Sequence, residues 1–160
     1  MLHRRHFLRL GAGAALGLTG LEGRGAPAPS GEAEGRIRRH VRLGRTGLMI
    51  SDISFGSASS SDPDLVRHAL ERGVNYFDTA ESYRWGRSET AIGEALKGRR
   101  ERVVLASKTK AGAQDRRAEM MTALVGSLRR LRTDYLDVYF NHAVNDVRRM
   151  QNEEWWAFTE

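Results

Sequence analysis

The sequence of 160 residues contains no cysteine, which excludes disulfides and thiolate-bound metal sites within it. It also lacks a strongly apolar run of about 20 residues, the length that a membrane-spanning helix requires. The best candidate, 10–21, is a short mixture of mainly Gly, Ala and Leu. No G-x-G-x-x-G motif follows the first expected strand, which argues against an open dinucleotide-binding sheet. With 40% hydrophobic residues, the chain can still form the core of one ordinary domain.

Charge is distributed unevenly along the chain. The 26 basic and 20 acidic side chains give a formal net charge of +6, and residues 1–25 carry half of this excess. A basic chain suggests a nucleic-acid partner when its positive charge is clustered on one surface. Here the remaining arginines are scattered over the ends and faces of expected helices. We therefore predict that the protein does not bind nucleic acid.

The N-terminal segment has the pattern of an export signal. The adjacent Arg4 and Arg5 open the sequence RRHFLRL, which is followed by a mildly apolar stretch and by APAPS. The paired arginines resemble a twin-arginine signal, which implies transport by the twin-arginine (Tat) translocon to the periplasm or another exported location. An ordinary secretory signal and a basic N-terminal helix are the alternatives. We expect a signal peptide over 1–28 and a flexible linker over 29–38.

After the linker, short apolar segments alternate with amphipathic ones. A β-hairpin is expected over 39–51, where the sequence GRTG suits the turn. Strands are expected within 51–60, 75–80, 102–109 and 135–142, and helices within 61–73, 88–98, 116–131 and 152–160. Strands that are buried on both faces and separated by helices favour parallel βαβ units. Two α/β architectures fit this order, an open doubly wound sheet and a (β/α)8 TIM barrel.

Single residues define the expected helix ends. Ser61 or Asp62 is expected to be the N-cap of the first helix, and Gly73 is expected to end it. The apolar face of this helix is expected to include Leu65. Ser88 is expected to be the N-cap of the second helix.

Polar side chains lie where three of the expected strands end. Asp78, Lys108 and His142 end the second, third and fourth strands, and Tyr83 lies in the loop after the second. The carboxyl ends of parallel strands face one rim of the fold, and active sites form there. Each residue alone has an ordinary structural explanation, such as a turn aspartate or a lysine that reaches solvent. The four together predict an active site.

These four side chains suit the reduction of a carbonyl group. We expect Lys108 to pair with Asp78, because a buried carboxylate is costly to desolvate without a partner. Tyr83, beside this cation, can donate its proton to a carbonyl oxygen. A neutral His142 can orient the carbonyl and donate a second hydrogen bond. No metal-ligand cluster accompanies them, so no metal is predicted. A hydride donor is required, which side chains cannot supply.

Four segments in order resemble the aldo-keto reductase family. They are LGRTGLMISDISFGS, FDTAESYRWGRSETAIGEAL, VVLASKT and SLRRLRTDYLDVYFNHAVN. The resemblance implies a (β/α)8 barrel that reduces small-molecule carbonyls to alcohols with NADPH, bound without a Rossmann motif. It also implies that Asp78, Tyr83, Lys108 and His142 form a catalytic tetrad, with Tyr83 as proton donor.

The resemblance implies further roles for individual residues. Gly56 and Ser57, at the end of the first strand, match positions near the nicotinamide. Asp78 and Asn141 are also expected to contribute to cofactor binding. Trp85 is expected either to line the substrate mouth or to be an aromatic packed within its loop.

The resemblance covers about the first four β-α units of a barrel, preceded by the hairpin. Because a complete barrel needs about 250 residues, we expect 39–160 to be the N-terminal half and the chain to be truncated. The family's main contacts to the cofactor phosphates come from later strands, so we expect weak NADPH binding or none. The alternatives are a non-catalytic reductase-like binding or regulatory subunit and an inactive fragment. Two open sheet edges would also favour self-association.

Overall fold

The computed structural model describes residues 35–160. The expected signal peptide and the part of the expected linker up to residue 34 lie outside the described residues. The strands are β1 (His40–Arg42), β2 (Met49–Ser51), β3 (Phe55–Gly56), β4 (Tyr76–Asp78), β5 (Val104–Thr109) and β6 (Val138–Asn141). The α-helices are α1 (Pro63–Glu71), α2 (Arg87–Ala95), α3 (Arg117–Leu131) and α4 (Glu153–Thr159), and the 3₁₀ turns are η1 (Tyr83–Gly86), η2 (Arg100–Arg102) and η3 (Val147–Arg149). Within 35–160, every helix is too short or too polar to cross a bilayer.

Strands β1 and β2 form the expected antiparallel hairpin, with Val41 opposite Ile50. Its turn contains Gly44 and Gly47 at φ values of 52° and 80°, the left-handed region that glycine adopts without strain. The Asn75 side chain, just before β4, accepts a hydrogen bond from the backbone of β2 and donates one to it. The hairpin is therefore attached at the amino end of β4.

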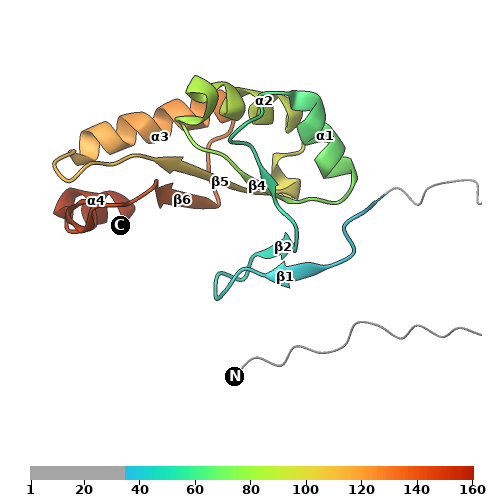
Figure 1. Cartoon of the computed structure of the whole chain (residues 1–160), viewed down its shortest axis with the longest axis horizontal. Coiled ribbons are helices and arrows are strands. Elements are labelled where there is room, and N and C mark those ends of the chain that lie inside the picture. The colour runs from blue at the N-terminus through green and yellow to red at the C-terminus, as the bar shows by residue number, and fades with distance from the viewer. Residues whose placement is uncertain (1–34) are drawn as a thin grey trace, which may run out of the picture. The chain divides into compact units, whose positions relative to one another are not determined.

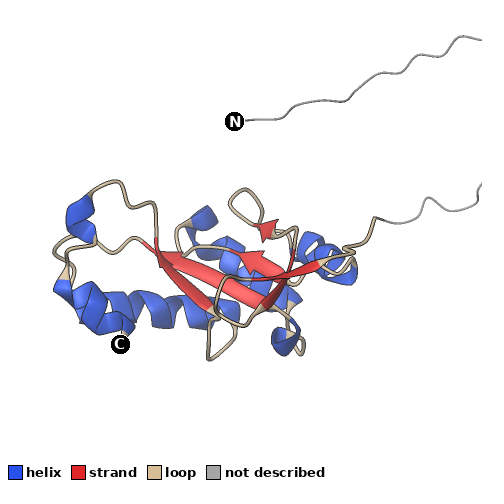
Figure 2. Ribbon diagram, turned by 90° about the horizontal axis from the view of Figure 1, so that it is seen from below, coloured by secondary structure: helices blue, strands red, loops and turns tan. Residues whose placement is uncertain are grey.

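The other four strands form one parallel sheet in the order β3-β4-β5-β6. Each strand lies beside its neighbours in the chain, and one α-helix occupies each connection. Helices α1, α2 and α3 lie along the same face of this sheet (Figure 1). Figure 2, seen from below, shows the strands in front of these helices. The predicted βαβ order is confirmed. A doubly wound sheet carries helices on both of its faces. The presence of α1, α2 and α3 on one face therefore agrees better with the wall of a barrel.

The core lies between the sheet and these helices. Phe77 and Leu105 are neighbours across β4 and β5, and both are fully buried. They pack with Val66 of α1, Ile92 of α2 and Leu131 of α3. Full burial of a side chain of this size contributes about 1.5–3 kcal/mol. Each connecting helix is thus held on the sheet by apolar contacts, which fixes where every strand ends.

Two helix details differ from the expectation. Asp62, the N-cap of α1, accepts a hydrogen bond from the Asp64 backbone as expected, but Leu65 is 50% exposed and lies outside the core. Ser88 is not a cap, because α2 begins at Arg87, directly after Gly86 in a left-handed conformation. Ser88 is instead buried inside the first turn of α2. A left-handed glycine can start a helix without a capping side chain, and no sequence pattern indicated that turn.

Candidate active site

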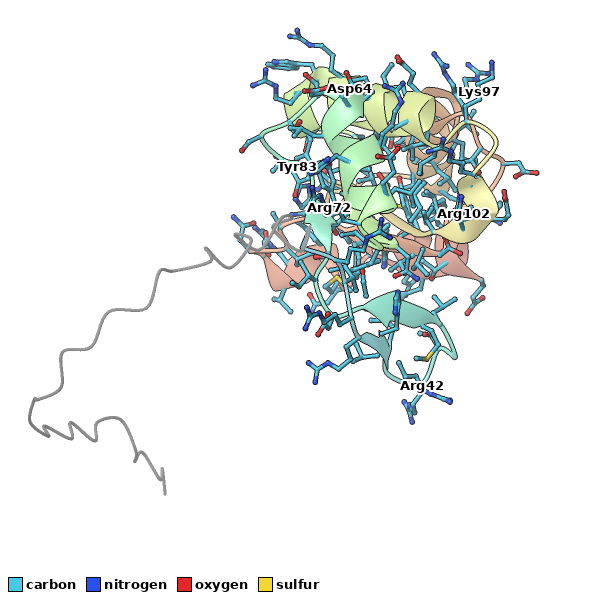
Figure 3. All side chains as sticks on the ribbon, turned by 90° about the vertical axis from the view of Figure 1, so that its right-hand side faces the viewer. Arg42, Asp64, Arg72, Tyr83, Lys97 and Arg102 are labelled. Atoms are coloured by element: carbon cyan, nitrogen blue, oxygen red, sulfur yellow. The ribbon has the colours of Figure 1, made fainter. Side chains whose placement is uncertain are left out.

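The carboxyl end of the parallel sheet brings the four predicted site residues together. Asp78 is the last residue of β4, Lys108 is the penultimate residue of β5, and His142 directly follows β6. Tyr83 opens the η1 turn in the connection between β4 and α2. We call these four residues the rim cluster. In Figure 3, Tyr83 lies on the opposite side of the view from Arg102, which precedes the amino end of β5.

Lys108 is the centre of the rim cluster. Its Nζ donates to Oδ1 of Asp78 at 2.5 Å and to the backbone oxygen of Thr79 at 2.6 Å. The Lys108 side chain is 13% exposed and that of Asp78 is 27% exposed. The expected ion pair is therefore present and half-buried. It explains an aspartate at the end of a core strand, because each charge offsets the desolvation of the other.

The phenol of Tyr83 lies between the lysine and the histidine. Its oxygen is 3.5 Å from Nζ of Lys108 and 3.5 Å from Nε2 of His142. Both distances are at the long limit of a hydrogen bond. The rings of Tyr83 and His142 meet edge to face, with centroids 5.4 Å apart. A proton on Tyr83 thus has a cation on one side and an imidazole on the other.

The environment of His142 favours the neutral imidazole. Burial, and then the positive charge of Lys108, hold its pKa below the ordinary value of 6.5. Its backbone N–H donates to the carbonyl of Thr109 at 2.7 Å, which ties the residue to the end of β5. Nδ1 is buried and has no hydrogen-bond partner within residues 35–160. A neutral ring can donate from one nitrogen and accept at the other.

The predicted cofactor residues differ in their surroundings. Gly56 pairs with Asp78 in the sheet, and a methyl group placed on it would have no neighbour within 4 Å. Ser57 is buried, and its hydroxyl donates to the Asp78 carbonyl at 2.8 Å. Oδ1 of Asn141 accepts from Arg149 at 2.7 Å. The structure thus leaves open space at Gly56, whereas Ser57 and Asn141 bond to neighbouring protein groups.

Trp85, in the loop after Tyr83, projects into solvent. It is 92% exposed, so the alternative of an aromatic packed within its loop is wrong. Arg84, Trp85 and Gly86 have consecutive positive φ values of 52°, 60° and 80°. The left-handed region costs most residues other than glycine about 1 kcal/mol or more, and such strain is concentrated at functional sites. The loop thus holds an exposed indole two residues from Tyr83.

A second polar cluster, which the sequence reasoning missed, supports this loop from the helix side. Glu89 of α2 is fully buried, and its Oε1 accepts from the Ser107 hydroxyl at 2.6 Å. Its Oε2 accepts from Nε of Arg130 at 2.6 Å. A Cβ added to Gly86 would lie 2.7 Å from Cδ of Arg130. We call Glu89, Ser107 and Arg130 the helix-side cluster. Its one signal in the sequence is an acidic residue three positions before the buried Ile92.

Residues 50–160 match the family described as the Aldo/keto reductase family. Methylglyoxal reductase YeaE of Escherichia coli is 46% identical over 80 residues, which are 48% of this chain and 27% of that protein. A probable voltage-gated potassium channel subunit beta of rice (Oryza sativa subsp. japonica) is 34% identical over 121 residues, 65% of this chain and 37% of that protein. The chain spans between 27% and 44% of the length of five curated relatives that it matches.

Solved structures agree with this result. An aldo-keto reductase from Klebsiella pneumoniae in complex with NADPH has a TM-score of 0.57 and 32% sequence identity. The alignment covers 69% of this chain and 43% of that one. The family match includes every strand of the parallel sheet and all four residues of the rim cluster. The chain therefore belongs to the aldo/keto reductase family.

Proposed function

We propose that the protein is an NADPH-dependent reductase that converts the carbonyl group of a small molecule to an alcohol. The observation that carries this proposal is the position of the Tyr83 hydroxyl, 3.5 Å from both Lys108 and His142. A phenol between an ammonium group and an imidazole is suited to proton donation. The relatives add support, since one is named a methylglyoxal reductase and one structure is a complex with NADPH.

In the proposed reaction, each member of the rim cluster has a separate role. The Tyr83 hydroxyl gives its proton to the carbonyl oxygen of the substrate. Lys108 stabilises the phenolate that remains, and Asp78 holds Lys108 in place through their ion pair. Neutral His142 orients the carbonyl through a hydrogen bond to its oxygen. NADPH, when bound, supplies the hydride that side chains cannot provide.

The residues present fit a nicotinamide beside the rim cluster. The space above Gly56 is open, and this glycine pairs with Asp78 in the sheet. A flat ring can approach a glycine backbone closely, because no side chain intervenes. Gly56 is therefore proposed to lie against the nicotinamide. Ser57 and Asn141 are proposed to contribute to the cofactor site through the positions that their hydrogen bonds define.

The proposed role of Tyr83 is tested with Tyr83→Phe in protein made from the complete gene. We expect the NADPH-dependent reduction of a test aldehyde to fall by about 10²- to 10⁴-fold in kcat, because the proton donor is lost. The control is Tyr135→Phe, which removes the hydroxyl of a tyrosine 44% exposed before β6. A Tyr83→Phe variant that keeps the wild-type rate would refute the proposed chemistry.

A second candidate is a non-catalytic binding or regulatory subunit. It is favoured by the similarity to a rice protein named a probable potassium channel subunit beta. A regulatory subunit does not need the Tyr83 proton for its action. If the wild-type protein reduces none of a panel of aldehydes, and Tyr83→Phe leaves NADPH binding unchanged, the regulatory candidate replaces the reductase.

Export is proposed from the N-terminal sequence. Arg4 and Arg5 are the paired arginines of the proposed signal over 1–28. Of the expected linker over 29–38, Ile37 is attached to the domain, since its backbone N–H donates to the Arg72 carbonyl at 2.8 Å and its side chain packs against the core. The partner during export is then the Tat translocon, and the location is the periplasm or beyond. Changing both arginines to lysine should leave the protein in the cytoplasmic fraction. Unchanged export of that variant would indicate an ordinary secretory signal.

Self-association is proposed through the sheet edges. Within residues 35–160, the outer edges of β3 and β6 have no strand partner. Unpaired edges are templates for pairing with another chain. Light scattering of the 160-residue chain should give a mass above its monomer value of 17.9 kDa. A monomer at micromolar concentration would exclude this partner.

A further inference from the structure

Arg149 holds the segment around His142 through four hydrogen bonds. Its Nη2 donates to Oδ1 of Asn141 at 2.7 Å and to the His142 carbonyl at 3.0 Å. Its Nη1 donates to the Ala143 carbonyl at 3.0 Å, and its Nε donates to the Ala111 carbonyl at 2.7 Å. A guanidinium group has five N–H donors in a rigid plane, so these bonds fix the acceptors relative to one another.

The four acceptors belong to two separate segments, one after β5 and one at the end of β6. Ala111 lies in the loop after β5, three residues beyond Lys108, and it is 2% exposed. The other three acceptors belong to consecutive residues at the end of β6. Arg149 itself comes from a third segment, the η3 turn. One side chain therefore joins the loop that follows the rim lysine to the residue that provides the rim imidazole.

The backbone beside His142 needs such a support. Ala143 has a φ of 49°, in the left-handed region that an alanine rarely adopts. Strained backbone persists only where the surrounding structure holds it. The Ala143 carbonyl accepts from Arg149, and no other group within residues 35–160 donates a hydrogen bond to that oxygen. Among residues 35–160, the one hydrogen-bond partner of the imidazole is the Tyr83 hydroxyl at 3.5 Å, so the position of the ring depends largely on its backbone.

We propose that Arg149 is a positioning residue for His142. Through the carbonyls of His142 and Ala143 it keeps Nε2 of the imidazole facing the Tyr83 hydroxyl, and it acts on the reaction only through that ring. The proposal rests on the proposed reductase function for its catalytic consequence. The structural part of the proposal concerns the relative positions of the His142 and Tyr83 rings, so it can be tested without cofactor and without turnover.

The first test measures ring placement by NMR on histidine- and tyrosine-labelled full-length protein. The wild type should show an NOE between the Tyr83 and His142 rings, whose centroids are 5.4 Å apart. In Arg149→Met this NOE should disappear, and the His142 ring signal should shift or broaden. Persistence of the NOE and of the wild-type signal in folded Arg149→Met would overturn the proposal.

The chain offers a matched control at the adjacent residue. Arg148 lies on the same η3 turn, its side chain is 77% exposed, and it binds only Asp146 among residues 35–160. Arg148→Met should therefore keep the NOE and the wild-type His142 signal. Loss of the NOE in both variants would show that any substitution in the η3 turn displaces the rings, and it would overturn a specific role for Arg149.

A milder substitution covers the case in which Arg149→Met does not fold. Arg149→Lys keeps the charge, but one ammonium group cannot reach acceptors in both segments with the planar geometry of a guanidinium. We expect a weakened NOE in Arg149→Lys. Guanidinium ion added to Arg149→Ala should restore the NOE. A full-strength NOE in Arg149→Lys would overturn the proposed four-bond role.

Activity separates this proposal from the proposed function. A displacement of about 1 Å at a catalytic group can cost about 100-fold in rate. Arg149→Met should therefore lower kcat by about 10- to 100-fold with little change in KM, and Arg148→Met should not. If the wild type shows the NOE but no reduction of any aldehyde, the reductase function fails and the NMR result still decides the role of Arg149.

Discussion

Two adjacent residues of β5 take part in polar contacts on opposite faces of the sheet, and each contact includes an ion pair. Ser107 faces the helices, where its hydroxyl donates to Glu89 of the Glu89–Arg130 pair. Lys108 faces the other side, where it pairs with Asp78. The two charge–charge contacts are nearly equal in length, 2.6 Å and 2.5 Å. Their surroundings differ, because Glu89 is fully buried whereas the Asp78 side chain is 27% exposed.

This difference in exposure separates a supporting role from the proposed chemical one. The helix-side cluster lies against Gly86 in the loop that carries Tyr83. Its Glu89 and Ser107 are fully buried, so a ligand in solution cannot reach these two side chains. The rim cluster lies at the ends of the strands, where a small molecule can reach Tyr83. Alternation along one strand therefore places a loop support on one face and the proposed reactive group on the other.

The largest effect is expected from Glu89→Gln. The substitution keeps the size of the side chain but leaves the Arg130 cation without its partner in a buried site. Loss of one partner from a buried pair costs about 3–5 kcal/mol. Because Arg130 is 35% exposed and can recover some hydration, we expect a loss near the lower limit, about 3 kcal/mol. Urea unfolding of both proteins measures it.

The matched control for this prediction lies on the same helix. Glu94 of α2 pairs with Arg67 at 3.1 Å, and its side chain is 48% exposed. Exposed pairs contribute about 0–1 kcal/mol, so Glu94→Gln should change the free energy of unfolding by less than about 1 kcal/mol. Equal losses in the two variants would show that burial does not distinguish the two pairs.

A smaller loss is expected from Gly86→Ala. Gly86 has a φ of 80°, and an added Cβ would lie 2.7 Å from Cδ of Arg130, which Glu89 holds in place. The backbone strain and the close contact together should cost about 2 kcal/mol. Gly98→Ala is the control, since it has a φ of 69° but open space around the new Cβ. If both variants lose the same stability, the contact with Arg130 has no measurable cost.

A still smaller loss of stability is expected from Lys108→Met. The substitution removes the hydrogen bonds from Nζ to Asp78 and Thr79. The carboxylate of Asp78 is 27% exposed, so water can replace the lysine in part. We expect a loss of about 1 kcal/mol in the free energy of unfolding, which is the net contribution of a typical intramolecular hydrogen bond. A loss equal to that of Glu89→Gln would place the rim pair in the same structural class as the buried one.

The sequence alone predicted the rim cluster because three of its four residues lie at strand ends and Tyr83 lies in the loop after one of them. Asp78, Lys108 and His142 each follow an apolar run, and strand ends in a parallel sheet converge whatever the lengths of the connections. The same reasoning predicted the alternation of strands and helices in parallel βαβ units, because short apolar segments alternate with amphipathic ones along the chain. Both predictions depend on local patterns that repeat along the chain.

The missed residues depend on contacts between distant positions. Glu89 and Arg130 are 41 residues apart, and Arg149 meets Ala111 across 38 residues. In the sequence each resembles an ordinary charged residue on a helix or loop. Their partners are defined only when α2, α3 and η3 have packed. The wrong N-cap at Ser88 has the same origin, because its hydroxyl donates to the distant Ser57 carbonyl at 2.9 Å.

The smallest expected effect is on the pH dependence of the free energy of unfolding. It tests the surroundings of the His142 ring. Burial and the Lys108 charge lower the pKa of His142 in the folded protein below 6.5, its ordinary value in the unfolded chain. As pH falls through 6.5, the unfolded chain binds a proton before the folded protein does, so the free energy of unfolding decreases. The decrease stops below the folded pKa, where both states are protonated.

His142→Gln should remove this component of the pH dependence. The difference in unfolding free energy between wild type and variant should then change with pH only between the folded pKa of His142 and 6.5. Lys110→Met should narrow that window, because the positive charge of Lys110 also lowers the pKa of His142. An NMR titration of the His142 ring, combined with urea unfolding at several pH values, measures both quantities. A His142 pKa at or above 6.5 would mean that burial and the charges of Lys108 and Lys110 do not outweigh the Asp78 carboxylate, which raises this pKa.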